Sequence, residues 1–335
     1  MNNILNINSN YIYISGSIGI KIIENKILNK KIFIFYDDHS NNIYCNKINK
    51  TNSLTNYNIF ISELFDLLIN NTNNISLILE EPFINKNDKI KILWEDSKHL
   101  LLFRKFYGKL INKCSMYKIC NTFPADIRLA LFDISPDEIM MNISKLDTTY
   151  MIPIITYMKN LFYLFDLSDK FNIVNKIDHS SIIYFIKKVF NAYNNSDYYL
   201  KLKKHIEKFI EKFVIPNKNL TILELFKKES INNNFKYTQG YPFINTNYND
   251  FIDQLDKLTS GIMELYMSIL TILTSKNNII IYAGYFHSNN LAFIFEKNYN
   301  FKVIYDIGNT NKINEKSILK NASCIKVDKQ YFNLI

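Results

Sequence analysis

The sequence is poor in the residues that mark several common classes of protein. Its four cysteines, Cys45, Cys114, Cys120 and Cys324, include no C-x-x-C pair. This excludes a zinc ribbon and a disulfide framework and favours a reducing compartment. Its seven glycines form no G-x-x-x-x-G-K loop, and no serine stands in a G-x-S-x-G elbow. These absences argue against nucleotide hydrolysis and against a serine esterase of the usual α/β kind.

Long apolar runs are also missing. No stretch approaches the roughly 20 residues that a membrane-spanning helix needs, and the first residues lack a basic region followed by a continuous apolar segment. We therefore expect no membrane span and a cytoplasmic location. The abundance of Asn, Ile and Lys is typical of an AT-rich genome such as that of a large DNA virus, for which the location would be the host cytoplasm or the virion.

Positive charge is in moderate excess. The chain has 40 basic and 31 acidic residues, so its formal net charge is +9, which favours weak attraction to polyanions and anionic surfaces. The densest lysine cluster, within residues 201–212, has the spacing of the solvated face of an amphipathic helix. Because no specific nucleic-acid motif is found, the expected partner is a small molecule or a peptide of unknown identity.

The 335 residues, 47% of them hydrophobic, are enough to bury a sizeable core. Short apolar runs alternate with stretches in which apolar residues recur every three to four positions, the pattern of strands alternating with helices. We expect an α/β fold with a mostly parallel central sheet flanked by helices, in a single domain over residues 1–335. Its core strands are expected at residues 32–36, 75–79, 117–123, 279–283 and 301–306, after a strand pair within residues 11–27.

Helices are expected between these strands. One is expected over residues 57–68, another over residues 252–273, and a third over residues 289–297 with Ser288 as its N-cap. Residues 129–235 contain several helical patterns and no alternating strand, so we interpret them as a helical insertion.

Polar side chains follow four of the expected strands. In an open α/β sheet the ligand crevice lies outside the carboxyl ends of the strands, so these side chains are expected to meet at one site. Histidine there serves as a general base or as a metal ligand, and neighbouring carboxylates set its tautomer and its pKa. The residues concerned are Asp37, Asp38, His39, Glu80, Glu81, Asp126, Arg128 and His287.

Each of these residues also has a structural interpretation. A single histidine at a strand end is more often a structural residue than a ligand. Because strand side chains alternate between faces, one acid of each adjacent pair is expected to face away from the site, and the sequence leaves open whether Glu80 or Glu81 faces it. Arg128 suits an oxyanion, and it equally suits a salt bridge with Asp126 or with one of these glutamates.

The order of these motifs resembles the superfamily that joins the TraB/PrgY pheromone-shutdown proteins, the Tiki proteases, and the erythromycin-esterase (EreA) and ChaN-like proteins. Residues 284–287, GYFH, match its G-x-x-H motif, and residues 36–39, YDDH, stand for its G-E-x-H-like motif. Two departures matter, since Tyr36 replaces glycine and Asp37 replaces glutamate. Members of the superfamily include esterases, metal-dependent peptidases and haem-binding lipoproteins, so the resemblance implies a fold more than a reaction.

Two functions are consistent with these features. The first is an esterase- or peptidase-like hydrolase in which His39 or His287 activates water, Asp37 and one of Glu80 or Glu81 orient the base or complete a metal site, and Arg128 stabilises developing negative charge. A divalent metal ion would be held by His39, Glu81 and His287. The alternative is a catalytically inactive binding or virion-associated protein that retains the fold.

Overall fold

The computed structural model describes residues 11–37, 57–71, 75–82, 122–132, 151–173, 181–232, 250–308, 310 and 324–331. The chain divides into two compact units. Unit 1 comprises Met1–Glu81, Asn87–Ala125 and Leu270–Ile335, and unit 2 comprises Pro82–Lys86 and Asp126–Ile269.

A six-stranded sheet organises unit 1 and confirms the α/β class. Strands β5, β7 and β3 form its parallel centre, and β2 and β8 continue the sheet beyond β3 in antiparallel pairing. Strands at or next to all four positions expected to precede site residues belong to this sheet. For the expected strand at residues 117–123, residues 117–121 lie outside the described residues, and β6 continues to Asp126, beyond the expected end. The strand order is β6 (Thr122–Asp126), β5 (Ile75–Pro82), β7 (Asn278–Gly284), β3 (Lys30–Asp37), β2 (Gly19–Asn25) and β8 (Lys302–Gly308).

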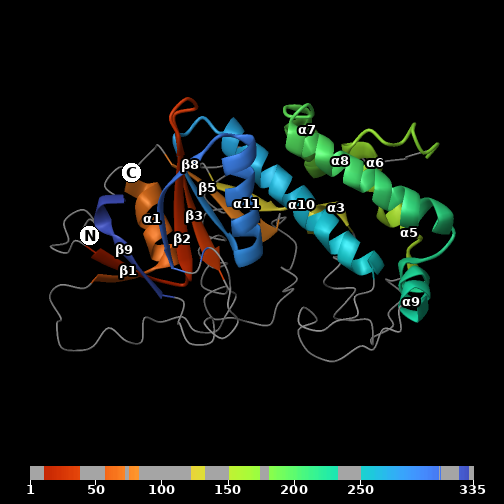
Figure 1. Cartoon of the computed structure of the whole chain (residues 1–335), viewed down its shortest axis with the longest axis horizontal. Helices are drawn as coiled ribbons and strands as arrows, with labels where there is room; N and C mark the ends of the chain where they lie inside the picture. Colours follow the sequence, from red (N-terminus) through yellow and green to blue (C-terminus); the bar gives the residue numbers. More distant parts are fainter. Residues whose placement is uncertain are drawn as a thin grey trace. The chain divides into compact units, whose positions relative to one another are not determined.

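The two central strands are buried on both faces. Every residue of β3 and β7 is buried, as expected for near-continuous apolar runs in a sheet covered by helices on both sides. Phe65 of helix α1 (Ile61–Asn71) contacts the rings of Phe35 and Tyr282 on one face. Tyr285 of helix α11 (Tyr285–Asn298) contacts Tyr36 on the other. Figure 1 shows α1 and α11 on opposite sides of the sheet.

A second, three-stranded sheet corrects the expected strand pair within residues 11–27. Strand β1 (Tyr11–Ser15) does not pair with β2; it lies between β4 (Tyr57–Phe60), which is parallel to it, and β9 (Cys324–Asp328), which is antiparallel. The helix expected over residues 57–68 starts later than predicted. Its first four residues form β4 of this second sheet. The helix begins at Ile61, where the Glu63 carboxylate accepts a hydrogen bond from the Phe60 N–H.

Apart from Pro82 and Asp126, which end β5 and β6, the regular structure in the described part of unit 2 is helical. Phe165, Phe190, Tyr199 and Tyr266 form an aromatic cluster in its core. Between residues 129 and 235, the described residues contain no strand beyond an isolated bridge between Pro153 and Thr221. The helices are α3 (Arg128–Leu131), α5 (Ile154–Tyr157), α6 (Lys159–Leu164), α7 (Ser181–Asn191), α8 (Asp197–Phe209), η3 (Ile210–Val214), η4 (Ile215–Asn217), α9 (Ile222–Asn232) and most of α10 (Asp250–Leu273).

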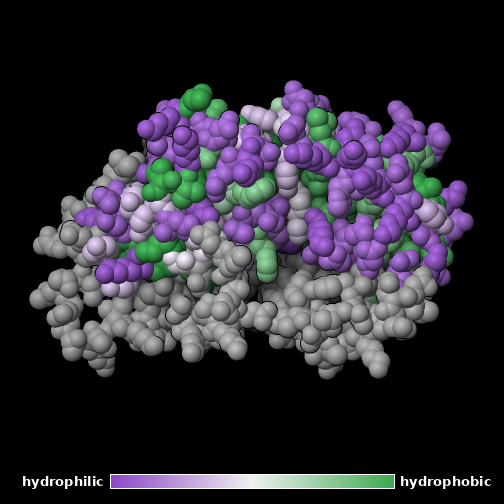
Figure 2. All heavy atoms as spheres, in the orientation of Figure 1, coloured by the Kyte–Doolittle hydropathy of each residue, from purple (hydrophilic) through white to green (hydrophobic). Residues whose placement is uncertain are grey.

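Eleven large apolar side chains are exposed among the described residues, and Ile27, at 94%, is the most exposed of them. Figure 2 shows hydrophobic side chains at the tip of the β2–β3 hairpin, beside hydrophilic ones. Among the helices that the structure describes, none combines the length and the apolar character needed to cross a bilayer.

Two adjacent lysines of β3 are buried to the same extent but differ in the hydrogen bonds of their ammonium groups. Lys30 and Lys31 are each 8% exposed, and burial lowers the pKa of both ammonium groups. Lys30 Nζ donates to the carbonyl oxygens of Thr274 (2.6 Å) and Lys276 (3.2 Å). Lys31 Nζ has no hydrogen-bond partner among the described residues and lies 5.1 Å from the centroid of the Phe33 ring.

We expect Lys31→Met to raise the free energy of unfolding by about 1 kcal/mol at neutral pH, because it removes a buried charge that has no hydrogen bond. The pKa of Lys31 is lower in the folded state, so the wild type gains stability as the pH rises through that pKa towards 10.5. The advantage of the variant should therefore shrink at high pH. Denaturant unfolding across pH measures both effects.

Lys30→Met is the matched control. It leaves two partly buried carbonyl oxygens without their donor, and we expect it to lower the free energy of unfolding by about 1 kcal/mol. Equal destabilisation by the two substitutions would contradict the account of this strand.

Candidate functional site

Strands β3 and β5, which lie on either side of β7, bring acidic residues to one edge of the six-stranded sheet. β3 ends at Asp37, β7 ends at Gly284, and β5 carries Glu80 and Glu81 just before its last residue. Asp37 lies opposite Gly284 in the parallel β3–β7 ladder. These residues therefore lie at the carboxyl ends of the parallel strands, the edge at which open α/β sheets bind ligands.

Glu80 and Glu81 point to opposite faces of the sheet. Leu79 is paired with Tyr282, whose ring contacts α1. Because successive strand side chains alternate, Glu81 shares the α1 face with Leu79, and Glu80 points to the α11 face. The same alternation places Asp37 on the α1 face. Asp37 and Glu81 are 1% and 4% exposed. The two predicted acids Glu80 and Asp37 therefore leave the sheet on different sides.

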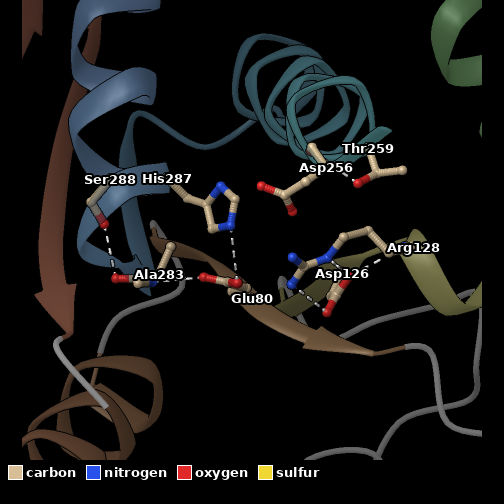
Figure 3. Close-up of polar contacts among 9 residues, drawn as sticks. Glu80, Asp126, Arg128, Asp256, Thr259, Ala283, His287 and Ser288 are labelled. Atoms are coloured by element: carbon tan, nitrogen blue, oxygen red, sulfur yellow. Dashed lines mark hydrogen bonds and ion pairs between the residues drawn. The ribbon is translucent and has the colours of Figure 1, made fainter. Parts of the chain in front are cut away.

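Glu80 connects β5 to the first turn of α11. Its Oε2 accepts a hydrogen bond of 2.6 Å from the backbone N–H of Gly284, and its Oε1 lies 3.5 Å from Nε2 of His287. Figure 3 shows the His287 ring directed at this carboxylate. Gly284 is the N-cap residue of α11, and the helix dipole stabilises a negative charge at that end. Both side chains of the Glu80–His287 pair are largely buried, at 10% and 14% exposed.

Ser288 anchors the helical turn that carries His287. Its hydroxyl is fully buried and donates to the carbonyl oxygens of Ala283 (2.9 Å) and Phe35 (3.1 Å). The expected N-cap role of Ser288 is wrong, because α11 begins at Tyr285 and Ser288 lies in its first turn. The serine thus ties the start of the helix to β7 and β3 and limits the positions open to His287.

The Glu80–His287 pair is arranged for proton transfer. When Nε2 carries a proton, that proton is directed at Glu80, and Nδ1 then holds the lone pair that accepts a proton from water. The Glu80 carboxylate favours the imidazolium ion that results. The pair supplies one imidazole and one carboxylate. Within the described residues no group of three or more His, Cys, Asp or Glu side chains is placed to hold a metal ion.

Arg128 and Asp126 form a bidentate ion pair in unit 2. Arg128 Nε donates to Asp126 Oδ1 at 2.9 Å and Nη2 donates to Oδ2 at 3.0 Å, as Figure 3 shows. The backbone N–H of Arg128 also donates to Oδ1, at 3.2 Å. Both residues are buried, at 8% and 5% exposed. Of the roles considered for Arg128, the salt bridge with Asp126 is therefore confirmed.

Tyr36 occupies the position at which the family resemblance expects glycine. Its side chain is fully buried, and its ring centroid lies 5.8 Å from that of Tyr285. Burial raises the pKa of its phenol, and the neighbouring Asp306 adds to this effect. The hydroxyl has no hydrogen-bond partner among the described residues. Tyr36 is therefore a neutral packing residue of the α11 face and not a general base.

Asp38 and His39 lie outside the described residues. The expectation that the rings of His39 and His287 lie within roughly 10 Å of each other therefore stays a prediction, based on the shared crevice of parallel strands. Of the proposed metal ligands His39, Glu81 and His287, Glu81 points to the α1 face, whereas His287 lies beside Glu80 on the α11 face. With His39 outside the described residues, the metal site stays a prediction.

Two structural contributions were not foreseen from the sequence, namely the Gly284 N–H as the donor to Glu80 and Ser288 as an anchor. The sequence contains no signal for the first, because Ser288 offers an ordinary N-cap and predicts a helix that begins after it. The structure begins the helix at Tyr285 with Gly284 as its N-cap, and glycine has no side chain of its own to bond the free N–H groups of the first turn.

Comparisons of the chain with protein-family models, with curated proteins and with solved structures find no match.

Proposed function

We propose that this protein is a hydrolase in which His287 is the general base and Glu80 orients it. The observation that supports this proposal is the contact of one carboxylate with both the His287 ring and the first N–H of the helix that carries it. A purely structural cap would need only the bond to Gly284. The second oxygen, directed at the imidazole at a carboxyl strand edge, is the arrangement that an activated histidine needs.

The proposed chemistry is attack of water on the carbonyl carbon of an ester or a peptide bond. His287 Nδ1 takes a proton from the attacking water, while Glu80 holds the Nε2 proton and stabilises the imidazolium ion. The same imidazolium then returns the proton to the leaving alcohol or amine. The oxyanion role expected for Arg128 from the sequence stays a prediction, since Arg128 belongs to unit 2 and its guanidinium is paired with Asp126.

We also retain the kinship with the TraB/PrgY, Tiki, erythromycin-esterase and ChaN-like proteins as a proposal. It rests on the motif order and on the finding that GYFH, residues 284–287, spans the end of β7 and the first turn of α11. The proposal includes one α/β domain with residues 129–235 as a helical insertion between β6 and the return of the chain to β7.

A panel of chromogenic esters and quenched-fluorescence peptides tests the proposed function. We expect turnover of at least one class by the purified chain, and loss of that turnover in His287→Ala. Each assay is run with and without added Zn²⁺, Mn²⁺ and Mg²⁺, because ligation by His39 would add a donor to the Glu80–His287 pair. A folded wild-type chain without activity on any member of the panel under either condition contradicts the hydrolase assignment.

One observation favours the second candidate function, a binding protein that retains the fold without catalysis. Tyr36 fills the position of a glycine that would leave the backbone accessible, and its fully buried ring packs on Tyr285. If the protein is a binding protein of this kind, the folded wild type shows no turnover. His287→Ala is then expected to weaken the binding of its ligand.

A further inference from the structure

The loop of the β2–β3 hairpin has an unusual composition for a turn. Lys26, Ile27, Leu28 and Asn29 connect the two strands, and the Asn29 N–H donates to the Lys26 carbonyl. Asn29 has a positive φ of 50°, as asparagine tolerates in such loops. The two central positions usually hold Asp, Asn, Ser, Pro or Gly. Here they hold two aliphatic residues.

Both aliphatic side chains are exposed. Ile27 is 94% exposed and Leu28 41%. The turn does not depend on these two side chains. It is held by backbone and Asn25 contacts, since the Asn25 side chain accepts a hydrogen bond from the Leu28 N–H. Departures from turn chemistry without a structural reason are expected at functional sites.

Two helix ends of unit 1 lie beside this loop. The Lys30 ammonium donates to the Thr274 carbonyl, directly after the end of α10, and the Asn25 amide donates to the Tyr299 carbonyl, directly after the end of α11. Leu273, 46% exposed, adds a third aliphatic side chain to this end of the sheet. We call Ile27, Leu28 and Leu273 the aliphatic tip.

Lysines surround the aliphatic tip. Lys26 is exposed within the loop, Lys297 is exposed in the last turn of α11, and Lys276 is partly exposed after α10. Lys302 is exposed at the start of β8, opposite Glu24 of β2. The acid Glu24 is also paired across the ladder with Lys31, so it is flanked by lysines on both strands. The described residues at this end of unit 1 are therefore predominantly cationic.

We propose that the aliphatic tip and its lysines form a docking surface for an anionic lipid membrane. Apolar side chains that project beyond a rigid hairpin can enter the acyl boundary of a bilayer, while lysines beside them interact with anionic headgroups. The net charge of +9 draws the protein to the same surface over a longer range. A nucleic acid would use the lysines and leave the aliphatic residues in water, so the membrane accounts for both features.

The position of the tip in unit 1 separates docking from the proposed chemistry. The hairpin loop lies where β3 begins, at the amino ends of the parallel strands, whereas Glu80 and Gly284 lie at their carboxyl ends. A membrane bound at the tip would leave the Glu80–His287 pair at the far edge of the sheet. Loss of docking and loss of hydrolysis are therefore separable results.

Vesicle co-sedimentation of the full-length chain tests the proposal. We expect binding to phosphatidylcholine vesicles that contain phosphatidylserine, weaker binding to phosphatidylcholine alone, and weakening by added salt. The double substitution Ile27→Ser and Leu28→Asn is expected to weaken binding about tenfold or more, because it removes both apolar contacts and restores residues that favour a turn. Lys26→Glu is expected to weaken binding to the anionic vesicles alone.

Phe286→Ser is the matched control for the vesicle experiment. Phe286 is 71% exposed but lies in the first turn of α11, at the opposite end of the sheet, so its loss is expected to leave sedimentation unchanged. Unchanged sedimentation of the double variant would overturn the proposal. So would a wild type that ignores both kinds of vesicle, or one that binds oligonucleotides while ignoring vesicles. Hydrolysis of a soluble substrate by the double variant should match the wild type in every case.

Discussion

Replacement of His287 by alanine is expected to lower turnover by roughly a hundredfold or more, the scale of losing a general base. The melting temperature is expected to change little, because Glu80 keeps its hydrogen bond to the Gly284 N–H and its position at the start of α11. Steady-state kinetics and thermal unfolding of the same preparation measure the two quantities.

His205→Ala is the matched control for the His287 substitution. His205 is an exposed residue of helix α8, so its removal is expected to leave both turnover and melting temperature unchanged. Parallel loss of stability and activity in His287→Ala would assign the histidine a structural role. Full activity in a folded His287→Ala would remove it from the catalytic site.

Gly308→Ala is expected to lower the free energy of unfolding by about 3 kcal/mol or more. Gly308 has a φ of +85°, and an added Cβ would lie 2.4 Å from the Ile18 carbonyl oxygen and 2.8 Å from the Gly19 Cα. Both contacts are with backbone, so the β2–β8 pairing itself must shift. Chemical denaturation, followed by a signal from the sheet, measures the loss.

Gly261→Ala gives a matched glycine replacement without this strain. Gly261 lies within α10, where an added Cβ would be 3.2 Å from a methyl carbon of Leu202, the end of a flexible side chain. The small cost of that contact is offset by the higher helix propensity of alanine, which is about 1 kcal/mol. We expect a change within about 1 kcal/mol in either direction. A similar loss in both variants would contradict the role assigned to the conformation of Gly308.

The sequence predicts the centre of the fold well because central parallel strands have a distinctive composition. β3 and β7 are buried along their whole length, and each therefore has a continuous apolar run at its centre. The expected strands at residues 32–36 and 279–283 are confirmed as parts of these longer strands. The long helix α10 shows the periodicity of a buried face and is confirmed over residues 252–273.

The partners of short strands could not be predicted in the same way. β1 pairs with β4 and β9, which are distant in sequence, and local apolar pattern carries no information on such partners. The sequence could not decide between Glu80 and Glu81 for a similar reason. Alternation separates the two side chains, but the face that α11 covers follows from its packing on Tyr36. Only then is Glu80 identified as the neighbour of His287.

A double-mutant cycle on Glu80 and His287 tests the central claim most directly, since the claim is that the two residues act as one unit. The rates to compare are kcat/KM for the wild type, Glu80→Gln, His287→Ala and the double variant. Glutamine keeps an oxygen for the Gly284 N–H but removes the charge beside the imidazole. We predict that Glu80→Gln lowers kcat/KM in the wild type and has almost no further effect once His287 is absent. Additive losses would show that the two residues act independently and would contradict the account.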